Sequence, residues 1–249
     1  MKKKVAFITG ANRGIGFETA RQLGQQGIYP IIGSRNAEQG KAAVEKLAAE
    51  GIESEYLKFD VLDKKDHAAA YDYIDGKFGK LDILVNNAGI SLEGDLVDSI
   101  GRTDNTSGIS EDTLRGTFDA NFFNVVFSTQ TLLPLLKKAE AGRIVNVSST
   151  LGSLTYHADP ASPIYAVKTF AYNASKTALN AFTVHLAHDL RDTTVKVNSI
   201  HPGWVQTELG GKSAPMPLVD GAKTSVRLAT IPADGPNGGY FHMEDALPW

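Results

Sequence analysis

Short apolar runs of strand length alternate with longer segments of helical pattern along the whole chain, and this alternation restricts the possible folds more than any other feature. It is typical of βαβ units, in which each helix crosses over a parallel sheet. The runs are rich in Ile and Val and alternate little with polar residues, as expected for strands that helices cover on both faces. We therefore predict an α/β fold built on a doubly wound parallel sheet.

The element boundaries come from the same pattern. The predicted strands are Val5–Ile8, Tyr29–Gly33, Ser54–Lys58, Ile83–Val85, Arg143–Val147, Val195–Ile200 and a shorter one at Gly239–Phe241. The predicted helices are Gly14–Gln26, Ala37–Ala49, Lys64–Lys77, Glu111–Leu136, Phe170–Asp189 and Gly221–Leu228. Two polar segments without a regular pattern are predicted to be loops, Ser91–Ser110 and Thr155–Pro163.

Composition excludes several classes of protein. The 249 residues show neither a linker nor an internal repeat, so we predict one domain over residues 1–249. A net charge of −3 gives no electrostatic argument for a nucleic acid or an anionic membrane as partner. The chain has no Cys, which fits a reducing compartment. The apolar run after Met1–Lys4 is too short for a signal peptide, and no stretch approaches the roughly 18 apolar residues of a membrane span. We expect a soluble, cytoplasmic protein.

A Gly-rich segment lies between the first predicted strand and the first predicted helix, with the spacing G-x-x-x-G-x-G. Glycines let the backbone approach a pyrophosphate, and the N-terminus of the helix offers free N–H groups. A Gly-rich turn without a ligand is the alternative, but the position between strand and helix favours a dinucleotide site. The residues expected to contact the cofactor here are Gly10, Asn12, Arg13, Gly14, Ile15 and Gly16.

The end of the second predicted strand indicates which dinucleotide binds. An NAD site places a carboxylate there for the ribose 2′-OH, whereas this chain has Ser34 and Arg35. Arg35 and Arg13 together are suited to a 2′-phosphate, although each alone is as readily explained as a surface charge. We therefore predict NADP(H). Asp60, followed by Val61 after the third strand, is placed to accept from the adenine amine, or else is an acid at the N-terminus of the next helix.

Tyr172 and Lys176 lie four residues apart in an Ala-rich run, so they share one face of a predicted helix. A cation beside a Tyr favours the phenolate, lowers its pKa from about 10 and makes the side chain a general acid/base. The spacing alone is weak evidence because Tyr73 and Lys77 repeat it. We interpret that second pair as the solvated face of an ordinary helix.

Six motifs in order resemble those of the short-chain dehydrogenase/reductase family. Besides the Gly-rich segment they are Asn86-Asn87-Ala88-Gly89, Asn121 in Asp119–Phe123, Ser149 in Val145–Ser149, Tyr172 with Lys176, and Pro202–Thr207. Within the family the chain is most similar to carbonyl reductases and their plant relatives that act on terpenoid or alkaloid ketones. That closer likeness rests on Leu81–Val85, Pro202–Val205 and the tail Gly235–Trp249.

The resemblance implies a Rossmann fold and a role for each matched residue. Tyr172 would protonate the alkoxide, Lys176 would hold the nicotinamide ribose and lower the Tyr pKa, and Ser149 would hydrogen-bond the substrate carbonyl. Asn121 would help to hold a water that passes protons to Lys176. The remaining expected cofactor contacts are Asn87, Ala88 and Gly89 on the adenosine-ribose side, and Gly203, Val205 and Thr207 on the nicotinamide side.

The implied activity is the reversible, NADPH-dependent reduction of a small ketone or aldehyde, without a metal. A 3-oxoacyl carrier-protein reductase shares every catalytic residue and is one alternative. A non-catalytic NADP(H)-binding redox sensor is another, but it would have no use for the Asn-Ser-Tyr-Lys set. The interval from Ser149 to Tyr172 is longer than in most members but much shorter than the insertion of the mammalian carbonyl reductases, which is associated with a monomeric state. The resemblance therefore sets neither the oligomeric state nor the substrate, since this loop flanks the site, and it does not give the product stereochemistry.

Several aromatic and histidine residues are expected to have structural rather than catalytic roles. His201 is expected to end a strand rather than act as a base, and Phe122 and Phe123 are expected to pack in the core. Trp204 either lines the substrate pocket or closes the core.

Overall fold

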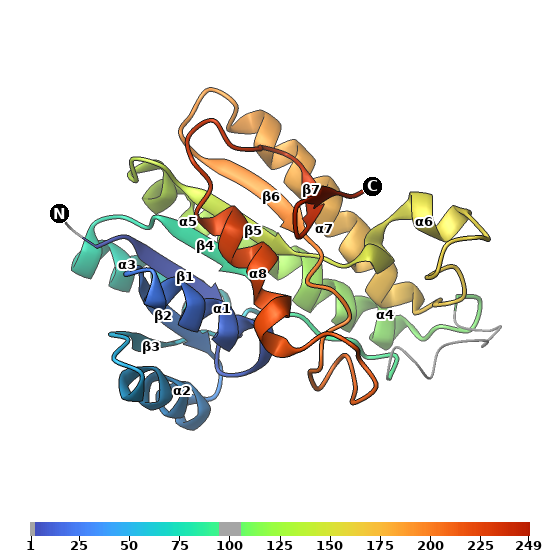
Figure 1. The fold of residues 1–249 in the computed structure, drawn as a ribbon, viewed down its shortest axis with the longest axis horizontal. Coiled ribbons are helices and arrows are strands. Elements are labelled where there is room, and N and C mark those ends of the chain that lie inside the picture. Colours follow the sequence, from blue (N-terminus) through green and yellow to red (C-terminus); the bar gives the residue numbers. More distant parts are fainter. Residues whose placement is uncertain (1–2, 95–105) are drawn as a thin grey trace.

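The computed structural model describes residues 3–94 and 106–249, and in these the chain forms an eight-stranded sheet between two layers of helices (Figure 1). The strand order is β3-β2-β1-β4-β5-β6-β7-β8, and every neighbouring pair is parallel except β7 with β8. The strands are β1 Val5–Thr9, β2 Tyr29–Ser34, β3 Glu55–Lys58, β4 Ile83–Asn86, β5 Arg143–Val147, β6 Lys196–Ile200, β7 Tyr240–His242 and β8 Asp245–Ala246. The predicted doubly wound parallel sheet is confirmed, with an antiparallel edge strand added.

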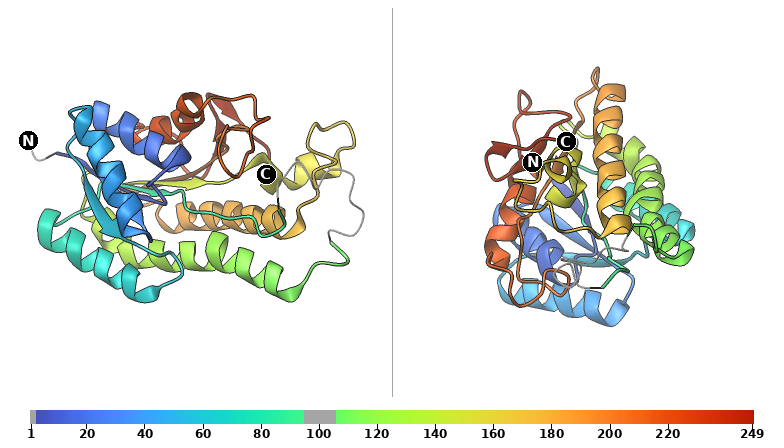
Figure 2. Two further views of the ribbon diagram at one scale, coloured as in Figure 1. Left: turned by 90° about the horizontal axis from the view of Figure 1, so that it is seen from below. Right: turned by 90° about the vertical axis from the view of Figure 1, so that its right-hand side faces the viewer.

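Helices cover both faces of the sheet. They are α1 Gly14–Gln25, α2 Ala37–Ala49, α3 Lys64–Phe78, α4 Glu111–Phe118, α5 Asn124–Lys137, α6 Leu154–Ala158, α7 Phe170–Asp189 and α8 Leu218–Ala229. Figure 2 shows α1 and α8 on one side of the sheet and α3, α5 and α7 on the other. Each layer has its own apolar core, because successive strand residues point to opposite faces.

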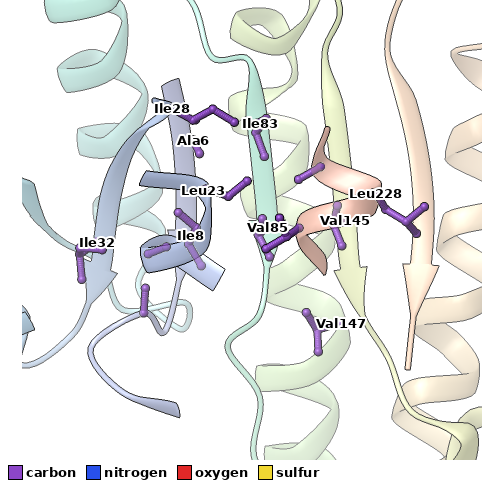
Figure 3. Packing of buried hydrophobic residues seen from close by; sticks show 14 of the residues in the cluster. Ala6, Ile8, Leu23, Ile28, Ile32, Ile83, Val85, Val145, Val147 and Leu228 are labelled. Carbon is purple, nitrogen blue, oxygen red and sulfur yellow. The ribbon is translucent and has the colours of Figure 1, made fainter. Parts of the chain in front are cut away.

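Successive residues of a single strand belong to different cores. On β1, Ile8 belongs to the same apolar cluster as Leu23 of α1 and Leu228 of α8, which Figure 3 shows. Its neighbour Phe7 packs on the other face, in the cluster that contains Leu132 of α5. Both faces of the central strands are therefore buried, which explains why their sequences carry so little polar alternation.

The structure corrects two predicted elements. The helix predicted over Glu111–Leu136 is interrupted by a π turn at Asp119–Phe123, which separates α4 from α5. The predicted loop Thr155–Pro163 begins inside α6, whose first turn is capped by the Ser153 hydroxyl, which accepts from Tyr156 N at 3.2 Å. Five residues are too few for a helical period to appear in a sequence.

Two further expectations concern loops and membranes. Of the predicted loop Ser91–Ser110, the part 95–105 lies outside the described residues. In the rest of the chain, no helix combines the length and the apolar character that crossing a membrane requires.

Candidate active site

The sequence motifs meet where the parallel strands end. The Gly-rich segment follows β1, Asn87–Gly89 follow β4, Ser149 follows β5, and Gly203–Thr207 follow β6. The strand order reverses between β1 and β4, so this edge of the sheet contains the topological switch point at which open α/β sheets bind ligands.

Close packing explains why glycines occupy the first loop. Gly10 and Gly14 have positive φ angles of 65° and 59°, which favour Gly. A Cβ on Gly10 would lie 3.1 Å from Ala88 Cα. A Cβ on Gly16 would lie 2.7 Å from Gly10 O and collide with the Asn87 amide. Glycine at both positions therefore allows the loop to pack closely on itself and on the segment after β4, as the expected dinucleotide-binding loop requires.

Thr9, which the sequence analysis did not select, joins this loop to the end of β4. Its hydroxyl oxygen accepts from the backbone N–H groups of Asn87 and Ala88, at 3.0 Å each. Asn87 Nδ2 in turn donates to Thr9 O at 2.9 Å and to Gly10 O at 3.2 Å. The Asn87 side chain therefore holds the two loops together, in addition to any contact that it makes with a ribose.

The N-terminus of α1 is suited to an anion. Its N-cap residue, Arg13, makes no side-chain capping bond, and the first turn contains no acid. The N–H groups of this turn and the positive end of the helix dipole therefore favour a phosphate. Ile15, in the same turn, is partly buried.

The Gly-rich loop contacts the end of β2 directly, because Ala11 N donates to Gly33 O at 3.0 Å. Arg35, two residues further on, is exposed. Arg13 forms an exposed ion pair at 2.5 Å with Glu208, which follows Thr207. Arg35 thus follows the end of β2, whereas Arg13 contacts the segment after β6 through an acidic neighbour that the sequence analysis did not consider.

Three other expected cofactor residues hold local structure. Asn12 Nδ2 donates to Gln39 Oε1 of α2 at 2.8 Å, and Ser34 Oγ donates to Asn36 O at 3.0 Å. Asp60 Oδ1 accepts from Leu62 N at 3.0 Å. The alternative of Asp60 as an acid that starts a helix is wrong, since Asp63 caps α3.

Val61, the residue after Asp60, is also held locally. Its carbonyl oxygen lies 2.8 Å from His67 Nε2 on α3. This bond fixes the chain just beyond β3, where the adenine is expected.

Tyr172 and Lys176 lie on one face of α7, as the spacing predicts, and both are buried. Lys176 Nζ donates to Val147 O at the end of β5 at 2.8 Å and lies 5.6 Å from the centroid of the Tyr172 ring. A Cβ on Gly89 would lie 3.3 Å from Asn121 Oδ1 and 3.4 Å from Lys176 Nζ. The structure therefore brings the segment after β4, the end of β5, the π turn and α7 into one small region.

Burial dominates the ionisation of the two groups. It raises the pKa of Tyr172 to about 12, and the Ser149 hydroxyl beside the ring lowers this pKa without offsetting the burial. Burial also lowers the pKa of Lys176 to about 8. The loss of solvation disfavours the charged form of each group and outweighs the other influences on the Tyr172 pKa, so the expected lowering by Lys176 stays a prediction.

Asn121 lies in the π turn, a feature that is frequent at functional sites. Its side chain makes two hydrogen bonds to the backbone of Ile90. Oδ1 accepts from Ile90 N and Nδ2 donates to Ile90 O, both at 2.8 Å. Nδ2 also donates to Ser175 Oγ of α7 at 3.0 Å. The amide thus ties the segment after β4 to the helix that carries Tyr172.

The second Tyr–Lys pair, on α3, has a different environment. Lys77 Nζ donates to Tyr73 OH at 3.2 Å, and Lys77 also pairs with Glu55 of β3. Tyr73 OH donates to Glu55 Oε2 at 2.6 Å, while burial and this carboxylate raise the Tyr73 pKa. The pair lies at the outer edge of the sheet, as the interpretation of a surface helix face requires.

The segment after β6 covers the Gly-rich loop. A Cβ on Gly14 would lie 3.8 Å from Thr207 Cγ2, and Val205 is buried and bridged to Met216. Trp204 is 44% exposed and its indole N–H donates to Gly210 O at 2.7 Å, so it does not close the core. Phe123 is 43% exposed, which makes the expectation of core packing wrong for this residue.

Two long-range contacts at the site had no signal in the sequence. Glu93 Oε2 accepts from Tyr172 N at 2.9 Å and so caps the first turn of α7, whose own N-cap residue, Thr169, makes no side-chain capping bond. Trp249 O accepts from Thr155 N at 3.0 Å and from Thr155 Oγ1 at 2.7 Å, which brings the tail to α6. These contacts join residues 79 and 94 positions apart.

Comparison with known proteins extends over the whole chain. Residues 4–217 match the short chain dehydrogenase family. The chain is 33% identical to "Short-chain dehydrogenase/reductase 1" of Saponaria officinalis, over 100% of this chain and 97% of that protein. It is 30% identical to "Carbonyl reductase [NADPH] 1" of Mus musculus, over 99% of both. The solved structure of salutaridine reductase from Papaver somniferum superposes with a TM-score of 0.80 at 30% identity, over 96% of this chain and 99% of that one.

Proposed function

Because the chain belongs to the short-chain dehydrogenase/reductase family, we propose that residues 1–249 act as one NADPH-dependent reductase of small ketones or aldehydes. The observation that carries this proposal is the buried group of Tyr172, Lys176 and Ser149 beside a Gly-rich cradle. The likeness to the mouse carbonyl reductase supports the carbonyl-reducing branch.

The cradle fits a nicotinamide dinucleotide. Its glycines allow the loop to pack closely against the segment after β4, and the first turn of α1 lacks a competing acid. Arg35 follows the end of β2, where no carboxylate is available for a ribose 2′-OH, and Arg13 lies in the Gly-rich loop that contacts this strand end; both residues support NADP(H). When bound, the cofactor supplies the hydride.

The chain supplies the proton and orients the carbonyl. With a pKa of about 12, the Tyr172 hydroxyl keeps its proton at neutral pH and donates it to the carbonyl oxygen as charge develops there. Ser149, beside that hydroxyl, holds the same oxygen. Lys176, with a pKa of about 8, exchanges a proton close to neutral pH. It can therefore return a proton to Tyr172 after Tyr172 has donated its own.

Exposed apolar side chains border this region. Four of them are exposed by between 39% and 64%. They are Leu92 in the segment after β4, Leu154 after the Ser149 turn, Trp204 after β6, and Trp249, whose carbonyl oxygen bonds to α6. Apolar surface around a few polar groups is typical of a pocket for a small organic ligand. We therefore infer that the substrate carries its carbonyl on an apolar body.

The test is turnover by a Tyr172→Phe variant against a panel of a quinone, an aromatic aldehyde, a cyclic terpenoid ketone and a 3-oxoacyl thioester, with NADPH and with NADH. We expect turnover to fall by at least about 10²-fold while the Kd for NADPH changes by less than about twofold. Tyr73→Phe, in the second Tyr–Lys pair, is the matched control and should leave turnover unchanged. Normal turnover by Tyr172→Phe would overturn the acid/base role.

The panel also separates the alternatives. A preference for the 3-oxoacyl thioester would assign the chain to the carrier-protein branch. Tight NADPH binding with no turnover on any compound would favour a redox sensor.

A further inference from the structure

His201 directly follows β6 and contacts three segments at once. Its Nδ1 accepts from Thr150 N at 3.2 Å, and its backbone N–H donates to Phe241 O of β7 at 2.8 Å. Its carbonyl oxygen lies 2.9 Å from His242 Nδ1, and the centroids of the two imidazole rings are 5.1 Å apart. One residue thus connects β6, β7 and the turn after β5.

The turn that His201 contacts carries Ser149. Ser149 Oγ accepts from Leu151 N at 3.2 Å, and Ser149 O accepts from Gly152 N at 2.8 Å. Both bonds lie within the turn. Its two ends are held from outside, since Ser148 N donates to Ile200 O of β6 at 2.8 Å and Thr177 Oγ1 of α7 donates to Gly152 O at 3.0 Å. Between these two ends, the bond from Thr150 N to His201 is the side-chain contact that holds the residue directly after Ser149.

The contact with Thr150 N defines the protonation state of the His201 ring. A backbone N–H can only donate, so Nδ1 of His201 must be unprotonated and the proton of the neutral ring must lie on Nε2. Burial and the neighbouring His242 lower the His201 pKa to about 3, so the ring remains an acceptor at neutral pH. A ring held in this way does not exchange protons during turnover near neutral pH.

We propose that His201 is a positioning residue that, by accepting from Thr150 N, orients the Ser149 hydroxyl toward the substrate carbonyl beside Tyr172. The inference rests on the proposed reductase function for its effect on turnover. The hydrogen bond itself does not depend on that function, and it can be measured separately.

Two substitutions of similar shape test the acceptor. His201→Asn places an oxygen near the position of Nδ1, whereas His201→Leu places a methyl group there. We expect His201→Leu to lower kcat about tenfold, because small misplacements of reacting groups are costly. His201→Asn should stay within about threefold of wild type, and the KM for NADPH should change by less than about twofold in both. Equal loss in the two variants would overturn the proposal.

A double-mutant cycle tests whether His201 acts through Ser149. In a Ser149→Ala background, His201→Leu should change kcat by less than about twofold, since the group that it positions is gone. A full, additive loss would overturn the proposal. Undiminished turnover by Ser149→Ala alone would instead contradict the role of Ser149 in the proposed function.

Hydrogen exchange gives a readout that is independent of activity. The amide of Thr150 should exchange at least about tenfold faster in His201→Leu than in wild type or His201→Asn, with distant amides of β1 unchanged. Equal protection in all three proteins would show that the bond is absent, whatever the substrate of the enzyme.

Discussion

Replacing Lys176 by Met should remove activity and at the same time change how the stability of the protein depends on pH. Lys176 is buried, and its Nζ donates to Val147 O. No ion pair with a carboxylate is formed by Lys176 among the described residues. A methionine side chain has a similar length and no charge, so it fits the same space without burying a cation.

The magnitude follows from the pKa of Lys176, which burial lowers from 10.5 to about 8. Since one pKa unit corresponds to about 1.4 kcal/mol, burying the charged form costs about 3 kcal/mol at neutral pH. Between pH 8 and 10.5 the unfolded chain still binds the proton that the native state has released, so the wild type becomes more stable as pH rises. The thioether of Lys176→Met does not titrate, and the variant lacks this gain.

The difference in unfolding free energy between variant and wild type should therefore fall by about 2.5 kcal/mol from about pH 7 to about pH 10. The lost bond to Val147 O costs about 1–3 kcal/mol at every pH and does not affect this change. Urea unfolding followed by circular dichroism at both pH values measures the difference in unfolding free energy between the variant and the wild type. Lys41→Met, on the exposed face of α2, is the control. A difference that stays constant with pH would refute the reasoning.

Three further predictions concern the cofactor site and α7. Arg13→Ala combined with Arg35→Ala should raise the KM for NADPH at least about tenfold and leave that for NADH nearly unchanged, as steady-state kinetics would show; equal effects would contradict a 2′-phosphate contact. Gly16→Ala should weaken NADPH binding at least about tenfold in a fluorescence titration, because its Cβ would lie 2.7 Å from Gly10 O, whereas Gly76→Ala, with open space around it, should not. Glu93→Ala should lower the Tm by about 2–6 °C in calorimetry through loss of the cap on Tyr172 N, and Glu93→Gln by less; no difference between them would argue against the cap.

Patterns with a short repeat were predicted well from the sequence. The strand expected at Arg143–Val147 has those bounds, and the strand expected at Val5–Ile8 ends one residue later. Apolar runs and strand length are local properties, so these predictions needed no tertiary information. The same holds for Tyr172 and Lys176, whose shared face follows from helix geometry alone.

Features set by distant neighbours were missed. Phe123 was expected in the core and is exposed, and it lies in the π turn that interrupts the predicted helix. Thr9, Glu93 and His201 bond to residues 78, 79 and 51 positions away, and a single sequence carries no signal for such pairs.

The sequence by itself determined the doubly wound sheet, the order of the motifs and the family, because each depends on residues that are close together in the chain. Only the tertiary structure decided the electrostatics of the site. The i, i+4 spacing of Tyr172 and Lys176 suggests attraction, but burial by surrounding segments raises one pKa and lowers the other. Solvation depends on everything packed around a group, and that becomes defined only when the chain has folded.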